Sequence, residues 1–123
     1  MNKFCVLGRL RDDPKINEIE NGSKVANIIL AVDRDYKDKD GNKITDFLRY
    51  SLWNKDAERL EKLSKQGALI QLEGHCTTKK VEGKEGPLYI MQPVVDSYKH
   101  IENVKRIENE TDEELQTENE VEK

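Results

Sequence analysis

The sequence predicts an all-β domain with one helix, in which five strands close into a small Greek-key barrel and a flexible acidic tail follows. Three observations carry this prediction. Five apolar or alternating stretches are separated by turn residues, one helical pattern lies between the third and fourth stretches, and the periodicity fades after residue 101. The 123 residues suffice for one modest core and not for two.

The first predicted strand covers residues 3–10. Gly8 inside it marks a bulge or a sharp bend, because glycine weakens a regular strand and tolerates irregular backbone. The strand ends at Asp12-Asp13-Pro14, where proline cannot donate to a ladder. A short extended piece over 15–20 then leads to the next turn.

The second predicted strand, 24–33, is the most hydrophobic run of the chain and is expected at the centre of the sheet. It follows Asn21-Gly22, a pair that favours tight hairpin turns. Residues 33–43 read as a charged hairpin loop that turns at Asp40-Gly41 and contains one aromatic side chain, Tyr36. We expect this loop to lie in water.

The third predicted strand, 46–53, has two faces of different chemistry. Because side chains alternate across a strand, Phe47, Arg49, Ser51 and Trp53 share one face, and Leu48, Tyr50 and Leu52 share the other. Either face could form core, since aromatic residues are common in cores. An unpaired charge is costly to bury, so Arg49 favours the first face as the solvent-exposed one. Two aromatics with a guanidinium between them are typical of a stacking platform.

A helix is predicted over residues 55–66. Asn54 stands at the expected N-cap, and Gly67 follows the last turn. Apolar residues recur at a three-residue spacing and form a narrow stripe that would close one end of a barrel. These residues are Ala57, Leu60 and Leu63.

The last two predicted strands are 68–80, interrupted at Gly74, and 88–98. A loop rich in breaker residues, 81–87, joins them. Pro93 should lie at an edge or a bulge, because it cannot donate to a ladder. Five strands with a helix between the third and fourth are typical of the oligonucleotide/oligosaccharide-binding (OB) fold.

Charge divides the chain into two parts. Residues 1–101 carry 18 basic and 16 acidic side chains, whereas 102–123 carry 3 basic and 9 acidic ones. The second part has too few apolar residues to offset the entropy of ordering. We therefore expect an OB domain over 1–101 and a disordered acidic tail over 102–123. The tail is either a solubilising extension or, through 108–123, a competitor that occupies the basic groove of the domain.

The sequence lacks signals for a membrane, a secretory route or catalysis. No run of 18 apolar residues and no signal-peptide pattern occur, so a cytosolic protein without membrane contact is expected. Cys5 and Cys76 read as buried reduced thiols, and His75 and Cys76 are neighbours on a strand that cannot easily share one metal ion. No nucleophile and base pair, metal cluster or phosphate-cradling loop is present, so no enzyme, catalytic residue, metal or cofactor is predicted.

The sequence resembles the bacterial and phage single-stranded DNA-binding proteins over about residues 1–101. The order and spacing of several short blocks carry the resemblance, and no single block is decisive. The blocks are Met1-Asn2-Lys3, Leu7-Gly8-Arg9-Leu10, Asp13-Pro14, Asn21-Gly22, Val25-Ala26-Asn27, Leu30-Ala31-Val32, Asp46-Phe47, Trp53-Asn54-Lys55-Asp56-Ala57-Glu58, Leu72-Glu73-Gly74 and Val94-Val95-Asp96-Ser97.

The resemblance implies an OB domain that assembles as a homotetramer and wraps single-stranded DNA without strong sequence preference. It implies a non-catalytic role in replication, recombination and repair, in the bacterial nucleoid or a phage-infected cell. Tyr36, Phe47 and Trp53 match positions where family members stack bases, and Arg49 matches a basic residue between two of them. Val81 replaces a tryptophan found in some members, and Tyr89 nearby is a candidate for extra stacking.

Further basic residues align with family positions that could line the DNA backbone. They are Lys3, Arg9, Lys37, Lys39, Lys55, Lys79 and Lys80, besides Arg49. Acidic residues alternate with the cations of the 33–43 loop and weaken its local field. We therefore expect modest attraction for phosphates and a larger share of binding from stacking.

The end of the chain departs from the family pattern. Typical members close with an acidic tip ending in Ile-Pro-Phe, which docks on replication and repair proteins, whereas residues 119–123 read Asn-Glu-Val-Glu-Lys. This weakens the prediction of partner recruitment through the tip.

The sequence is also compatible with two other functions. An OB-fold primosome or phage accessory protein would act mainly through protein contacts, and it would bury Trp53. An RNA-binding cold-shock-like barrel fits less well, because such barrels carry a denser aromatic cluster.

Overall fold

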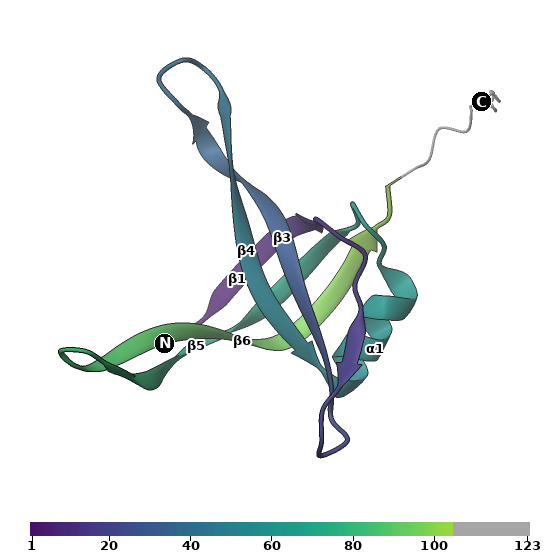
Figure 1. The fold of residues 1–123 in the computed structure, drawn as a ribbon. Helices are drawn as coiled ribbons and strands as arrows, with labels where there is room; N and C mark the ends of the chain where they lie inside the picture. The colour runs from purple at the N-terminus through teal and green to yellow at the C-terminus, as the bar shows by residue number, and fades with distance from the viewer. Residues whose placement is uncertain (105–123) are drawn as a thin grey trace.

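The computed structural model describes residues 1–104 as a curved, fully antiparallel sheet with one helix (Figure 1). Its strand order is β2-β3-β1-β5-β6, and β4 pairs with the other side of β3. The elements are β1 (Phe4–Leu10), β2 (Ile16–Glu18), β3 (Lys24–Lys37), β4 (Lys43–Trp53), α1 (Asn54–Leu63), β5 (Leu69–Gly83) and β6 (Gly86–Glu102). This confirms the predicted class, the element order and the place of the helix. A sixth strand, β2, corresponds to the extended piece predicted over 15–20.

Strand β1 joins the two halves of the sheet, because it pairs with β5 along its whole length and with β3 at its end. The prediction of a bulge at Gly8 was wrong, since the β1–β5 register is regular through this residue. Glycine is needed here for a close approach instead. A Cβ at Gly8 would lie 2.8 Å from Val32 Cγ2 and 2.9 Å from Ala31 O.

The predicted interruption at Gly74 is confirmed. The β5–β6 register shifts between Glu73 and Gly74, and a Cβ at Gly74 would overlap the carbonyl oxygen of Val94. Pro93 lies on β6, which pairs only with β5 and is therefore an edge strand. Proline is tolerated there because one side of the strand needs no donor.

Two segments predicted as loops, 33–43 and 81–87, are instead largely paired strands. Residues 33–45 form a hairpin that we call the β3–β4 arm, and residues 77–92 form a second one, the β5–β6 arm. The two arms project from the barrel in different directions (Figure 1). An exposed hairpin ribbon needs no apolar face, so its strands can consist of charged and breaker residues. Such a composition is typical of loops, and the sequence therefore predicts loops here.

The tip of the β3–β4 arm is closed by a side-chain cap. Asp38 Oδ1 accepts hydrogen bonds from the backbone N–H groups of Asp40 (2.9 Å) and Asn42 (2.8 Å), and Gly41 has a positive φ of 80°. Glycine adopts this conformation without steric cost. The predicted turn at Asp40-Gly41 is thus confirmed.

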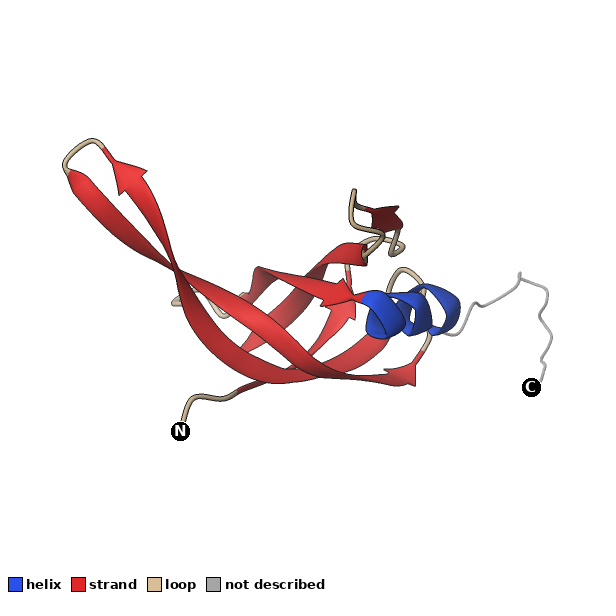
Figure 2. Cartoon of the chain, turned by 90° about the horizontal axis from the view of Figure 1, so that it is seen from below, coloured by secondary structure: helices blue, strands red, loops and turns tan. Residues whose placement is uncertain are grey.

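Helix α1 lies at one end of the sheet (Figure 2) and begins and ends differently from the prediction. Asn54 is not the N-cap, because Trp53 holds that position and Asn54 has a φ of 52°. The Asn54 side chain accepts a hydrogen bond from the backbone N–H of Lys24 (3.0 Å) instead. The helix ends at Leu63, which is 40% exposed, so only Ala57 and Leu60 of the predicted stripe are buried.

The core fills the space between the helix and the concave side of the sheet. Fully or nearly buried side chains from every strand except β2 contribute to it, together with two from the helix. They are Val6, Leu10, Ala26, Ile28, Leu30, Leu52, Ala57, Leu60, Ala68, Ile70, Leu72 and Tyr98. Phe4 stacks on Tyr50 at the margin of this cluster, with 5.4 Å between ring centroids.

A buried hydroxyl ties the end of the helix to β6. Ser64 Oγ is fully buried and lies 2.6 Å from the Tyr98 hydroxyl and 2.8 Å from His100 Nδ1. Burial raises the pKa of Tyr98, so its phenol stays neutral and available for this bond at ordinary pH. Asn103 adds a second tie, donating to Leu63 O (3.0 Å) and accepting from Lys65 N–H (3.1 Å).

The thiols and the candidate metal neighbours differ partly from expectation. Both cysteines are free, but Cys5 is exposed and Cys76 half-buried, because β1 turns Phe4 and Val6 inward and leaves Cys5 on its uncovered outer face. His75 Nδ1 lies 2.9 Å from Asp96 Oδ2. Among residues 1–104, no cluster of three His, Cys, Asp or Glu side chains could hold a metal ion, and no helix is long and apolar enough to cross a membrane.

The predicted acidic tail lies mainly outside the described residues. Strand β6 continues to Glu102, one residue past the predicted end of the domain, and Asn103 still contacts the helix end. The predictions of disorder and of competition for the groove concern residues 105–123, which lie outside the described residues.

We predict that Ser64→Ala lowers the free energy of unfolding by about 1–3 kcal/mol, because the buried Tyr98 hydroxyl and the half-buried His100 ring lose their partner. Urea denaturation followed by circular dichroism measures this. Ser97→Ala on the exposed part of β6 is the matched control and should change stability by less than about 0.5 kcal/mol. Equal stability of the two variants would show that the Ser64 hydroxyl contributes nothing.

Candidate nucleic-acid interface

Strand β4 turns its aromatic and cationic face to solvent, as predicted. Leu52 is fully buried, and Leu48 and Tyr50 pack against the core. On the opposite face, Phe47 is 56% exposed and Trp53 is 48% exposed. Arg49 between them is also exposed and makes no ion pair with any described residue. Packing of the alternate residues in the core therefore fixes this face outward.

The cross-strand neighbours of this face are small or apolar. Arg49 stands opposite Ile29 on β3, and Phe47 stands opposite Ala31. Ala31 is also the register partner of Arg9 on β1, which places Arg9 on the same face, one strand further away. The small side chain of Ala31 leaves the Phe47 ring raised above the sheet, where a planar ligand could reach it.

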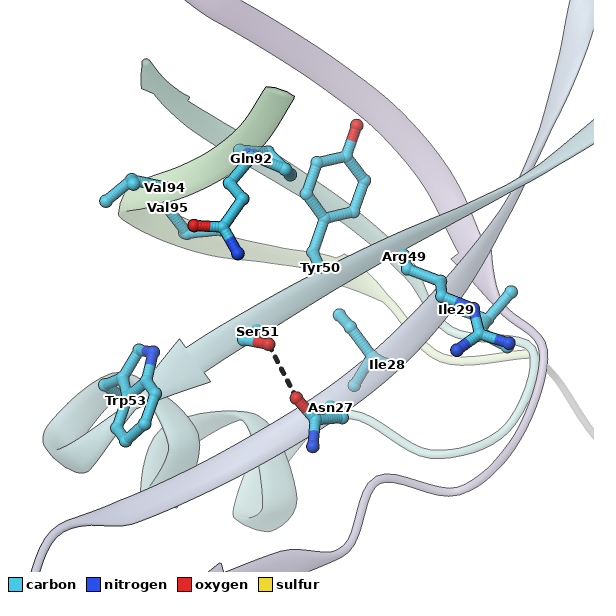
Figure 3. A pocket seen from close by; sticks show the side chains of 11 residues that line it. Asn27, Ile28, Ile29, Arg49, Tyr50, Ser51, Trp53, Gln92, Val94 and Val95 are labelled. Carbon is cyan, nitrogen blue, oxygen red and sulfur yellow. Dashed lines mark hydrogen bonds between the residues drawn. The ribbon is translucent and has the colours of Figure 1, made fainter. Parts of the chain in front are cut away.

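A polar pair interrupts this apolar surface. Ser51 Oγ donates a 2.6 Å hydrogen bond to Asn27 Oδ1 across β3 and β4. The bond leaves the amide NH₂ of Asn27 free to donate outward. Figure 3 shows this pair between the Trp53 ring and Arg49.

A groove of about 540 Å³ opens between β4 and β6. Each of these strands pairs with only one neighbour, so the barrel is not closed by hydrogen bonds between them. Gln92, Val94 and Val95 of β6 face Tyr50, Ser51 and Trp53 of β4 across the groove (Figure 3). Its wall is mostly apolar with a few polar groups, which is the usual character of a ligand site.

The third predicted aromatic, Tyr36, lies away from the groove on the β3–β4 arm and is 62% exposed. It stands near Ile44, nine residues from Trp53 along β4, which is roughly 30 Å at about 3.4 Å per residue. Phe47 lies between the two. The three aromatics therefore follow one long ribbon and do not line a single pocket.

Tyr36 is accompanied by an ion pair that sequence reasoning missed. Arg34 Nε and Nη2 each donate to one carboxylate oxygen of Asp46 at 3.0 Å, and Arg34 Nη1 donates to the Tyr36 hydroxyl at 3.3 Å. These hydrogen bonds hold the pKa of Asp46 below its usual range and raise that of Arg34. Both groups stay charged throughout neutral pH. The twelve-residue separation of Arg34 and Asp46 gave no local signal of this contact.

A second arginine missed by sequence reasoning lies at Phe47. The Arg11 guanidinium carbon is 6.0 Å from the centre of the Phe47 ring, and Arg11 Nε donates to Asp12 Oδ2 at 3.0 Å. Cation–π attraction of this kind is modest at an exposed site. Arg11 follows β1 directly, so the β1–β3 register could have located it.

The eight predicted cations are all exposed, but the structure does not gather them in one patch. Arg49 and Arg9 share the β4 face, whereas Lys37 and Lys39 lie on the β3–β4 arm and Lys79 and Lys80 on the β5–β6 arm. Lys55 is the second residue of helix α1, which begins directly after Trp53. Lys3 and Arg9 are engaged by carboxylates, Lys3 with Glu73 at 3.4 Å and Arg9 with Glu102 at 3.5 Å.

Tyr89, the candidate for extra stacking, is 65% exposed on the β5–β6 arm opposite Lys80. Its neighbours on β6 are also exposed and apolar, namely Leu88, Ile90 and Met91. Val81 stands opposite Leu88, so this arm carries aliphatic residues with one aromatic ring.

Comparison with known proteins adds independent information. Residues 1–107 match the family described as the single-strand binding protein family. The "Single-stranded DNA-binding protein" of Oceanobacillus iheyensis is 33% identical over 103 residues, which cover 83% of this chain and 64% of that protein. "Single-stranded DNA-binding protein 1" of Lactococcus lactis is 32% identical over 106 residues (85% of this chain, 71% of that protein).

A third relative, "Single-stranded DNA-binding protein 1" of Staphylococcus aureus, is 31% identical over 113 residues, or 91% of this chain and 72% of that protein. The matched region thus spans about two thirds of the length of these relatives.

Proposed function

Because the chain belongs to the single-strand binding protein family, we propose that it binds single-stranded DNA without strong sequence preference and protects it during replication, recombination and repair. The observation that carries the proposal is the exposed face of β4, where Phe47 and Trp53 flank Arg49, which forms no ion pair within residues 1–104. Every base has a π face, so such a surface binds bases regardless of sequence. Members of this family are not enzymes, which confirms the prediction of a non-catalytic protein.

The proposed path of the strand follows the β3–β4 ribbon. Bases stack on Trp53 and Phe47, and then on Tyr36 of the arm, while Arg49 meets the phosphates between the first two rings. The groove between β4 and β6 gives room for bases beside Trp53. Tyr89, Lys79 and Lys80 could extend the contact along the β5–β6 arm, and Lys37, Lys39, Lys55, Lys3 and Arg9 are the remaining proposed backbone contacts.

The proposed DNA-binding domain covers residues 1–101, and the proposed acidic tail covers residues 102–123. The proposed homotetramer rests on the family resemblance. Exposed apolar side chains away from β4, such as Leu7 on β1 and Ile90 on the β5–β6 arm, supply surface that further copies could cover. We propose that the protein acts at the bacterial nucleoid or at phage DNA in an infected cell, because the proposed function requires DNA.

The rival primosome or accessory role is less well supported. A protein of that kind is predicted to bury Trp53. In the structure, however, the Trp53 ring is about half exposed beside an open groove.

We predict that Phe47→Ala and Trp53→Ala each weaken binding of labelled oligo-dT by about 1–3 kcal/mol, because each removes one stacked base. Fluorescence anisotropy at fixed salt measures the dissociation constants. Leu63→Ala removes a comparably exposed apolar side chain from the helix and is the matched control, with no expected effect. The proposal fails if the wild-type chain binds duplex DNA as tightly as oligo-dT, or if all three variants bind alike.

We further predict that Arg49→Gln makes affinity less sensitive to salt. The negative slope of log affinity against log salt should become shallower by about 0.7, the value for one phosphate contact on a single strand. Titrations at four or more salt concentrations give the slope. Lys62→Gln on the helix serves as control and should leave it unchanged. An unchanged slope for Arg49→Gln would mean that this guanidinium meets no phosphate.

A further inference from the structure

The β3–β4 arm contains an irregularity at a cluster of three side chains, Arg34, Tyr36 and Asp46. The register of β3 and β4 shifts between Asp33 and Lys37, so that Arg34, Asp35 and Tyr36 stand opposite the single residue Ile44. A bulge of this kind redirects side chains from the regular alternation of the strand. Arg34 lies at this irregularity and contacts both the carboxylate of Asp46 and the hydroxyl of Tyr36.

The geometry leaves Arg34 little freedom. Two of its nitrogens hold both oxygens of Asp46 at 3.0 Å, a bidentate arrangement that only a planar guanidinium can make. Its third nitrogen donates to the Tyr36 hydroxyl at 3.3 Å. The Tyr36 ring is therefore fixed at both ends, by its Cβ on β3 and by its hydroxyl on Arg34.

The charge of Arg34 is already neutralised by Asp46. An arginine held this way is poorly placed to attract phosphate, unlike Arg49, which has no carboxylate partner among residues 1–104. Its remaining chemical role is orientation. Holding an exposed ring in place before a ligand arrives lowers the entropy lost on binding.

We propose that Arg34 and Asp46 are positioning residues that hold the Tyr36 ring as a prepared platform for one base on the β3–β4 arm. The proposal rests on the proposed function, because it specifies how one of its three stacking residues works. Arg34 acts through Tyr36 and contacts no nucleotide itself.

The test is a double-mutant cycle on oligo-dT affinity, measured by anisotropy at several salt concentrations. Arg34→Gln should weaken binding about two- to tenfold in the wild-type background, the range expected for one immobilised side chain. In the Tyr36→Ala background it should change nothing. The slope against salt should be the same for wild type and Arg34→Gln.

Two further variants separate orientation from charge. Arg34→Lys keeps the charge but cannot hold Asp46 and the hydroxyl together, so it should bind as weakly as Arg34→Gln. Tyr36→Phe keeps the ring and the ion pair but loses the hydroxyl, so it should show a similar loss even if an Arg34 variant folds poorly. Lys43→Gln is the matched control, since it breaks the 3.5 Å ion pair with Asp33 on the same arm without touching Tyr36.

Each of the following results would overturn the proposal. The Arg34→Gln effect could persist in the Tyr36→Ala background, Arg34→Lys could restore full affinity, or Arg34→Gln could lower the salt slope by about 0.7, which would indicate a phosphate contact. If wild type binds oligo-dT and Tyr36→Ala binds equally well, this inference fails and the proposed function stands. If wild type does not bind oligo-dT, the proposed function itself fails.

Discussion

The packing of Leu48, Tyr50 and Leu52 against the core is the constraint on which the candidate site depends. A strand has two faces, and committing one to the core leaves the other to solvent. Phe47, Arg49 and Trp53 are exposed for that reason. Exposed apolar patches on a protein surface are typical of binding sites, and the chain belongs to the single-strand binding protein family.

The incomplete closure of the barrel determines where a ligand can lie. Strands β4 and β6 have no hydrogen-bonded partner on their facing sides, and the groove runs between them. The two arms extend the β3–β4 and β5–β6 ribbons beyond the barrel, so that aromatic and basic residues are distributed over a long path. Such a distribution suits an extended, flexible polymer better than a compact ligand.

The sequence predicted the class, the element order and the outward face of β4, because alternation and an unpaired arginine are local signals. The sequence-based prediction was wrong for segments that lie in solvent and for side chains whose partners are distant in the chain. The sequence predicts loops where the arms lie, because exposed ribbons carry no apolar alternation. It also predicts a helix cap at Asn54, whose side chain instead bonds to Lys24, thirty residues away in the chain. The contact of Arg34 with Asp46 depends on how β3 pairs with β4, which the sequence of neither strand shows alone.

The most direct test of the stacking account uses Trp53, the only tryptophan, as a reporter of one position. Its fluorescence should be compared during titration with oligo-dT and with an abasic oligodeoxyribose phosphate of the same length and charge. Strong, saturating quenching by oligo-dT with little quenching by the abasic strand is the predicted result, because only the first can stack on the ring. Equal responses to the two strands would contradict the account, since binding would then depend on phosphates alone.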